Sequence, residues 1–170
     1  MALHTFARTA AALAAGAAFA LAAVPAGAAT PSYSKVVAFG DSLTDTGNVL
    51  EVTTVLSGIF PGAFTPLPQP ADYFNGRFSN GRVAVEVLAD GLKGGLNDGQ
   101  SLFLENYAYG GAQTGVNGND LPNTGMLSQL SSYQKSLAPG VGADANALYF
   151  VWGGGNDLRS AASNPGAAPM

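Results

Sequence analysis

The stretch KVVAFGDSL, residues 35–43, decides the fold that the sequence predicts. Residues 35–39 form a short, nearly uninterrupted apolar run rich in valine, which is typical of a strand buried on both faces in a parallel sheet. The tripeptide GDS at 40–42 then ends the run. Backbone N–H groups at a helix start point outward, so Ser42 is a candidate nucleophile beside an oxyanion site. The alternative is that Ser42 only caps the helix.

The rest of the chain continues this order of elements. Further strands are predicted over 101–107 and 147–152, where apolar and aromatic residues gather in short runs. Helices are predicted between the strands, one beginning at Val49, one over 82–92 and one over 126–137. Strands that alternate with helices predict an α/β fold with a parallel sheet and right-handed crossovers.

Gly-rich polar segments follow all of the predicted strands. They lie at 40–48, 110–115 and 153–157. Residues 57–80 are predicted to be a long structured loop, and no periodic element is predicted after Ser160. Because sites in open α/β sheets form outside the carboxyl ends of the strands, the placing of the polar segments predicts a functional site there.

Two of these segments hold candidate partners for Ser42. The backbone N–H groups at Gly110 and Gly111 and the side-chain amide of Asn156 are hydrogen-bond donors that could face the same oxygen as Ser42. Glycine also allows the backbone to approach a ligand closely. Taken singly, the two glycines are equally typical of an ordinary turn, and an isolated asparagine in Gly-Asn-Asp is more often a turn residue.

Four stretches together resemble the motifs of the SGNH/GDSL hydrolases, a family of serine esterases and lipases. They are VAFGDSLTDTGN at 37–48, NGRFSNGR at 75–82, NYAYGGA at 106–112 and GGND at 154–157. The stretch at 75–82 is similar to a segment of the secreted GDSL lipase/esterase branch. Each motif alone is weakly specific, but all come in family order and the resemblance covers essentially all of residues 35–158.

The resemblance implies a role for each matching residue. Ser42 matches the nucleophile, Gly111 the backbone donor of the oxyanion hole, with Gly110 as the alternative, and Asn156 the side-chain donor. The matching residues expected to organise the loops are Asp41, Asp45, Asn48 and Asp157. No metal or other cofactor is expected.

The resemblance also implies a fold. It is a three-layer α/β/α sandwich with a flavodoxin-like parallel sheet of strand order 2-1-3-4-5. The predicted strands correspond to 2-1-3, so the sequence looks like this fold truncated after its third strand. The strand over 147–152 would then be an apolar edge.

The sequence departs from the family pattern in one respect. The family's catalytic Asp-x-x-His, in which His is the general base, has no match, and the only histidine is His4. General-base assistance contributes roughly 10²–10⁴-fold. Residues 30–170 are therefore expected to be the N-terminal part of a hydrolase domain, and the chain as given to be nearly inactive.

Residues 1–29 are predicted to be a secretory signal peptide. They hold no acidic residue, and an apolar Ala/Leu run over 10–24 precedes a small-residue site. Cleavage is expected after Ala28 or Ala29, which places the mature protein outside the cytoplasm with no segment that spans a membrane. The alternative is an uncleaved membrane anchor.

The composition and the motifs limit the kinds of molecule that the protein is expected to bind. The 170 residues suit one domain, and 7 basic against 11 acidic residues argue against a nucleic-acid surface. The expected partner is a small-molecule or lipid ester, with short-chain esters, phospholipids and acetylated sugars all open. The alternative function is a non-catalytic ligand- or glycan-binding protein that keeps the hydrolase fold. Nucleotide binding is disfavoured because no Gly-Lys-Ser/Thr turn is present.

Overall fold

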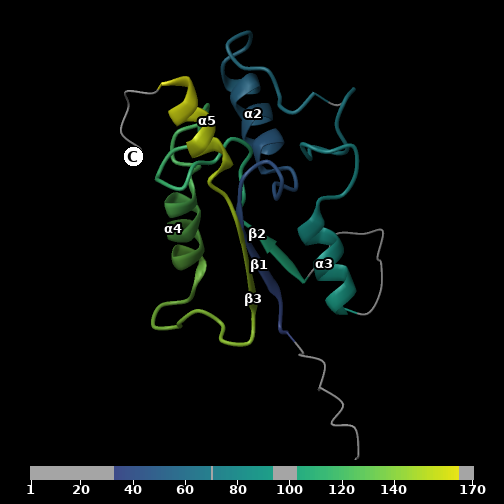
Figure 1. The fold of residues 1–170 in the computed structure, drawn as a ribbon, viewed down its shortest axis with the longest axis vertical. Helices are drawn as coiled ribbons and strands as arrows, with labels where there is room; N and C mark the ends of the chain where they lie inside the picture. Colours follow the sequence, from purple (N-terminus) through teal and green to yellow (C-terminus); the bar gives the residue numbers. More distant parts are fainter. Residues whose placement is uncertain (1–32, 70, 94–102, 165–170) are drawn as a thin grey trace, which may run out of the picture. The chain divides into compact units, whose positions relative to one another are not determined.

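The computed structural model describes residues 33–69, 71–93 and 103–164. In this part of the chain, three strands alternate with four helices (Figure 1). The strands are β1 (Val36–Gly40), β2 (Leu104–Asn106) and β3 (Leu148–Trp152). The helices are α2 (Asn48–Ile59), α3 (Ala84–Lys93), α4 (Met126–Ser136) and α5 (Gly155–Ser163).

The sheet has β1 at its centre. Its strand order is β2-β1-β3, and both strand pairs are parallel. Val36 is in register with Leu104 on one side and with Leu148 on the other. The predicted α/β fold and the order 2-1-3 are thereby confirmed.

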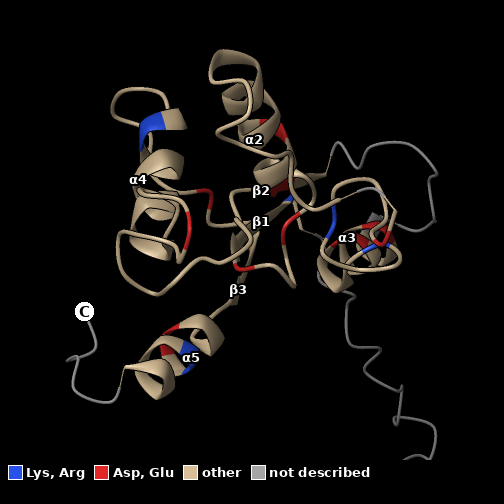
Figure 2. Cartoon of the chain, turned by 90° about the horizontal axis from the view of Figure 1, so that it is seen from above, with Lys and Arg blue, Asp and Glu red and all other residues tan. Residues whose placement is uncertain are grey.

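Both faces of β1 are covered by helices, which explains why every residue of this strand is buried. Successive side chains of a strand point to opposite faces. Val36 and Ala38 accordingly pack in a cluster with Ala89 of α3, whereas Val37 packs in a cluster with Tyr133 of α4. Figures 1 and 2 show α3 and α4 on opposite sides of the sheet. The molecule therefore has the three layers that were expected.

The strand β3 lies at an edge of the sheet. The side chains at its carboxyl end are strongly exposed, with Val151 62% and Trp152 53% exposed. Within the described ranges no further strand pairs with it. This arrangement matches the apolar edge that the sequence predicts.

Two elements differ from the prediction. Helix α5 lies where turn residues and an aperiodic stretch were expected. It has no buried residue, so it forms without the buried apolar face that an amphipathic helix of a globular domain normally has. The strand predicted over 101–107 is only the short β2, and residues 101–102 lie outside the described residues. The predicted signal peptide at 1–29 also lies outside them.

Candidate active site

Ser42 lies in a tight turn at the carboxyl end of β1. The N–H groups of Thr44 and Asp45 both donate to the carbonyl of Asp41 at 3.0 Å, and the Asp41 carboxylate accepts the N–H of Leu43 at 3.0 Å. Ser42 is half-buried, and no hydrogen bond among the described residues engages its N–H or its hydroxyl. The turn therefore presents both groups of Ser42 without a competing partner.

Only glycine fits at position 40, immediately before this turn. A Cβ there would lie 2.6 Å from the carbonyl oxygen of Trp152 and 2.9 Å from the hydroxyl of Thr44. Both distances are shorter than a van der Waals contact. The close approach of β1 to β3 at this point therefore depends on Gly40.

The carboxylate of Asp45 links the segment that follows the serine turn to the segment after β2. Its carboxylate is fully buried and accepts four backbone N–H groups. Three come from the start of α2, at 2.7 Å from Gly47, 2.7 Å from Asn48 and 3.3 Å from Val49. The fourth comes from Gly110 at 2.8 Å. Burial raises the pKa of Asp45, and the four N–H donors partly oppose that shift. The N-cap of α2 is Gly47, and the carboxylate of Asp45, not the hydroxyl of Ser42, accepts the first N–H groups of the helix.

Asn48 fastens the same two segments a second time. Its side-chain amide donates to the carbonyls of Asn106 at 3.1 Å and Ala108 at 2.8 Å. In return, the Asn106 side chain donates to the carbonyl of Thr44 at 2.7 Å. These contacts fix the distance between the serine turn and the glycines that follow β2.

The two glycines after β2 have different surroundings. The N–H of Gly110 is already donated to Asp45, and a Cβ at this position would overlap the ring of Phe78. Gly111 has a φ of +79°, in the left-handed region that favours glycine. Its N–H makes no hydrogen bond within the part of the chain that the structure describes. Of the two, only Gly111 has an N–H available for a ligand.

Asn156 lies in the first turn of α5. Its amide donates to the carbonyl of Ala112 at 2.9 Å, and its side-chain oxygen accepts from Asn119 at 3.3 Å. An amide nitrogen carries two hydrogens, so one remains for another acceptor. The next residue, Asp157, accepts the N–H of Thr114 at 3.1 Å and its hydroxyl at 2.6 Å. Both residues bind α5 to the loop that follows Gly111.

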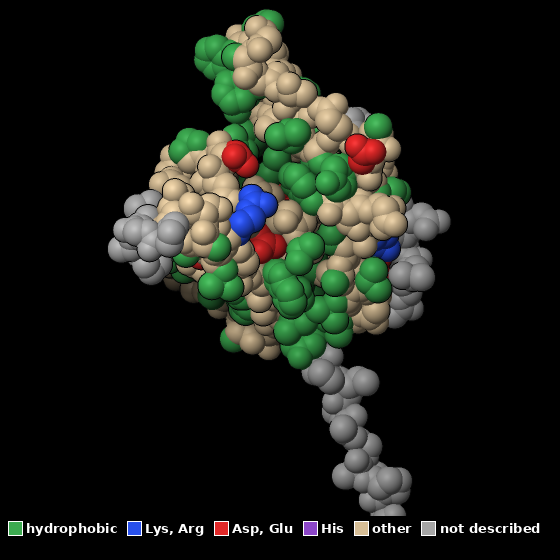
Figure 3. Space-filling view, turned by 45° about the horizontal axis from the view of Figure 1, so that its top comes forward, with side chains coloured by type: hydrophobic (Ala, Val, Ile, Leu, Met, Phe, Trp, Pro, Cys, Tyr) green, Lys and Arg blue, Asp and Glu red, His purple; other side chains and the backbone are tan. Residues whose placement is uncertain are grey.

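A single pocket of about 350 Å³ brings the candidate residues together. Ser42, Gly110, Gly111 and Asn156 all line it, although they follow three different strands. The face that carries the strand ends is shown in Figure 3, where hydrophobic side chains surround a few charged ones. Asp41, Asp45, Asn48 and Asp157 do not line this pocket but hold the loops around it.

Gln129 on α4 was missed by the sequence interpretation. Its side chain is only 2% exposed. Its oxygen accepts the N–H of Gly40 at 2.9 Å, and its nitrogen donates to the carbonyl of Gly40 at 2.9 Å and to that of Thr124 at 2.8 Å. The available signal was a polar residue on the apolar face of the predicted helix, between Met126 and Tyr133.

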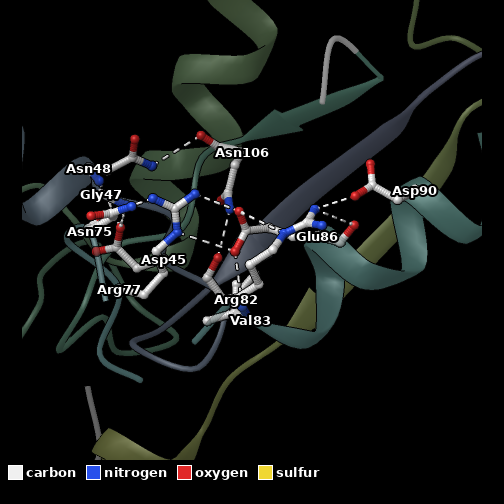
Figure 4. A network of polar contacts seen from close by, with 11 residues as sticks. Asp45, Gly47, Asn48, Asn75, Arg77, Arg82, Val83, Glu86, Asp90 and Asn106 are labelled. Carbon is white, nitrogen blue, oxygen red and sulfur yellow. Dashed lines mark hydrogen bonds and ion pairs between the residues drawn. The ribbon is translucent and has the colours of Figure 1, made fainter. Parts of the chain in front are cut away.

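An ion-pair network holds the 75–82 segment against α3 (Figure 4). Arg77 donates to both carboxylate oxygens of Glu86, at 2.5 and 3.2 Å. Glu86 also accepts the N–H of Val83 at 2.9 Å, and Arg82 pairs with the fully buried Asp90. Phe78 follows Arg77 directly and lines the pocket. The network therefore fixes the backbone that carries one wall of the pocket.

The described residues offer no grouping of three or more His, Asp or Glu side chains suited to a metal ion. None of the helices in these ranges has the length and apolar character that a membrane span requires.

A family model described as GDSL-like Lipase/Acylhydrolase matches residues 36–168. The chain belongs to this family. The resemblance inferred from the four sequence motifs is confirmed, and membership in the GDSL family supports an ester-hydrolase type of activity at the level of the family.

Curated relatives agree with this assignment. The thermolabile hemolysin of Vibrio parahaemolyticus serotype O3:K6 (strain RIMD 2210633) is 37% identical over 133 residues, which is 75% of this chain and 26% of the relative. The GDSL esterase/lipase At3g09930 of Arabidopsis thaliana is 37% identical over 63% of this chain and 31% of its own. The phosphatidylcholine-sterol acyltransferase of Aeromonas hydrophila is 31% identical over 75% of this chain and 33% of its own. The chain thus spans about a quarter to a third of the length of these relatives.

Proposed function

We propose that this protein is an exported serine hydrolase of carboxylic esters that works through an acyl-enzyme on Ser42. The observation that carries the proposal is the single pocket lined by Ser42, Gly111 and Asn156. Ser42 has no competing hydrogen bond among the described residues, and the same pocket is lined by a backbone donor, Gly111, and a side-chain amide donor, Asn156. Donors aimed at a developing negative charge are the main requirement of acyl transfer.

The reaction follows from these groups. The Ser42 oxygen attacks the ester carbonyl carbon, and the carbonyl electron pair moves to the oxygen. That oxyanion accepts hydrogen bonds from the N–H groups of Ser42 and Gly111 and from the second amide hydrogen of Asn156. The bond from carbon to the alcohol oxygen then breaks, and the alcohol leaves with a proton. Water adds to the acyl-enzyme in the same way, which releases the acid and restores Ser42.

Gly111 is the backbone donor in this proposal, in preference to Gly110. The N–H of Gly110 is donated to the buried carboxylate of Asp45, and breaking that bond would leave a buried acceptor less well satisfied. The N–H of Gly111 carries no such cost.

The proton of the Ser42 hydroxyl needs an acceptor. The only histidine of the sequence is His4, which lies outside the described residues. We infer that the base is a histidine in a longer gene product, in line with the greater length of the relatives. The 170-residue chain alone would then hydrolyse esters roughly 10²–10⁴-fold more slowly than the complete enzyme. Export is proposed from the signal-peptide pattern of residues 1–29.

Hydrolysis of p-nitrophenyl esters by the full-length gene product tests the proposal. Ser42→Ala is expected to abolish Ser-dependent turnover, because no nucleophile remains. Asn156→Ala is expected to lower kcat about 10²–10³-fold, the usual cost of losing one oxyanion donor. The matched control is Ser57→Ala, which removes an exposed hydroxyl of α2 that does not line the pocket.

Ser57→Ala should keep the wild-type rate. A folded wild-type product that hydrolyses no ester would favour the non-catalytic binding protein instead. Full activity in Ser42→Ala would show that no acyl-enzyme forms on Ser42.

A further inference from the structure

The pocket beside Ser42 has two sides of different chemistry. The side that comes from α2 and the segment after it is largely apolar and includes Val49, Phe64 and Leu67. The side that comes from the 110–121 loop and α5 carries Asp120 and Arg159. Helices α2 and α5 lie apart when the molecule is seen from above, as Figure 2 shows. A bound ester therefore meets an uncharged surface in one direction and a charged surface in the other.

The apolar side continues out of the pocket. No charged residue occurs between Glu51 and Asp72, so α2 beyond its first turn and the segment after it are uncharged. Phe64 and Leu67 line the pocket and are still 40% and 43% exposed. Phe60 is 52% exposed, and its ring centroid lies 6.2 Å from that of Phe64. Phe60, Phe64 and Leu67 therefore form an apolar wall that extends beyond the pocket itself.

We propose that this wall binds the acyl chain of the ester and that the enzyme consequently prefers medium-length acyl chains to acetyl. The inference rests on the proposed function, since Ser42 must be the acylated residue. An acyl chain gains free energy with each methylene that leaves water for an apolar surface. The charged side offers no such gain to an acyl chain, so it faces the alcohol part of the ester.

The test compares p-nitrophenyl octanoate with p-nitrophenyl acetate, which share one leaving group. Phe64→Ser and Leu67→Ser in the full-length gene product are expected to lower the octanoate-to-acetate ratio of kcat/KM by about tenfold, because each removes much of an apolar side chain from the wall. Acetate hydrolysis is expected to fall less than octanoate hydrolysis, because the acetyl group is too short to contact most of the wall. Both rates come from the same protein sample, so a partly unfolded variant does not change their ratio.

Two controls use the same replacement by serine. Leu127→Ser alters an exposed leucine of α4, 57% exposed and away from the pocket lining. Arg159→Ser alters the charged side of the pocket. Neither should change the octanoate-to-acetate ratio.

The outcomes separate the two proposals. An unchanged ratio in Phe64→Ser and Leu67→Ser, with hydrolysis still abolished by Ser42→Ala, would overturn the acyl-chain assignment and leave the esterase proposal in place. A wild-type enzyme that hydrolyses acetate faster than octanoate would also overturn the assignment. A wild-type, full-length protein that hydrolyses neither ester in a Ser42-dependent way would overturn the esterase proposal itself.

Discussion

At the scale of single residues, Gln129 has the clearest consequence for the site. Its side chain hydrogen-bonds to both the N–H and the carbonyl of Gly40, the residue that precedes the serine turn. It reaches Gly40 from α4, which packs on one face of the sheet. A buried amide that pairs with both the N–H and the carbonyl of one residue holds the backbone at that position. Gln129 is therefore a positioning residue for the turn that presents Ser42.

Replacement of Gln129 by leucine is predicted to lower the free energy of unfolding by about 2–4 kcal/mol, because it removes the hydrogen-bond partner of the buried N–H of Gly40 and that of the carbonyl of Thr124. Urea denaturation followed by circular dichroism measures this change. The matched control is Gln134→Leu on the exposed side of the same helix, for which a change within about 0.5 kcal/mol is expected. Equal effects of the two substitutions would show that Gln129 does not hold the turn.

At the scale of elements, the carboxylate of Asp45 joins the start of α2 to the segment after β2. Four backbone N–H groups converge on it. Two segments that are far apart in the sequence thereby share one buried acceptor. The separation between Ser42 and Gly111, which decides whether both can face one oxygen, depends on this shared carboxylate.

The titration of Asp45 gives this junction a characteristic pH dependence. Burial raises its folded-state pKa above the ordinary value of 3.8, so the folded protein binds this proton more tightly than the unfolded chain. Its contribution to stability is complete below pH 3.8 and is lost as the pH rises through the raised pKa. The free energy of unfolding of the wild type, relative to Asp45→Asn, is therefore predicted to fall over that interval.

Denaturation curves of both proteins at a series of pH values measure this difference. The variant cannot titrate at position 45, so all other groups cancel to first order. A difference that grows as the pH rises would mean that the four N–H donors outweigh burial and lower the pKa of Asp45.

At the scale of the whole molecule, β1 and β3 could be predicted because each is a short apolar run bounded by glycine, whereas the strand order 2-1-3 was implied by the resemblance to the SGNH/GDSL hydrolases. The run at 36–40 is buried on both faces, and this is the condition under which a strand loses alternation in its sequence. The pocket residues could be predicted only together with the family motifs. Gly110, for example, could not be separated from Gly111 until the hydrogen bond from Gly110 to Asp45 was known.

The parts that could not be predicted depend on contacts between distant segments. Helix α5 is not driven by an apolar face and is held instead by polar contacts, such as those of Asp157 with Thr114. The role of Gln129 depends on a strand 89 residues earlier in the chain. No local pattern of residue types encodes either arrangement, since each arises when the sheet is assembled.

The central claim is that Ser42 is the acylated residue. The most direct measurement treats the full-length gene product with a fluorophosphonate and locates the adduct by tandem mass spectrometry in the tryptic peptide 36–77. One fluorophosphonate adduct is expected, on Ser42 of the wild type, and none in Ser42→Ala. An adduct on another residue, or labelling that is unchanged in Ser42→Ala, would contradict it.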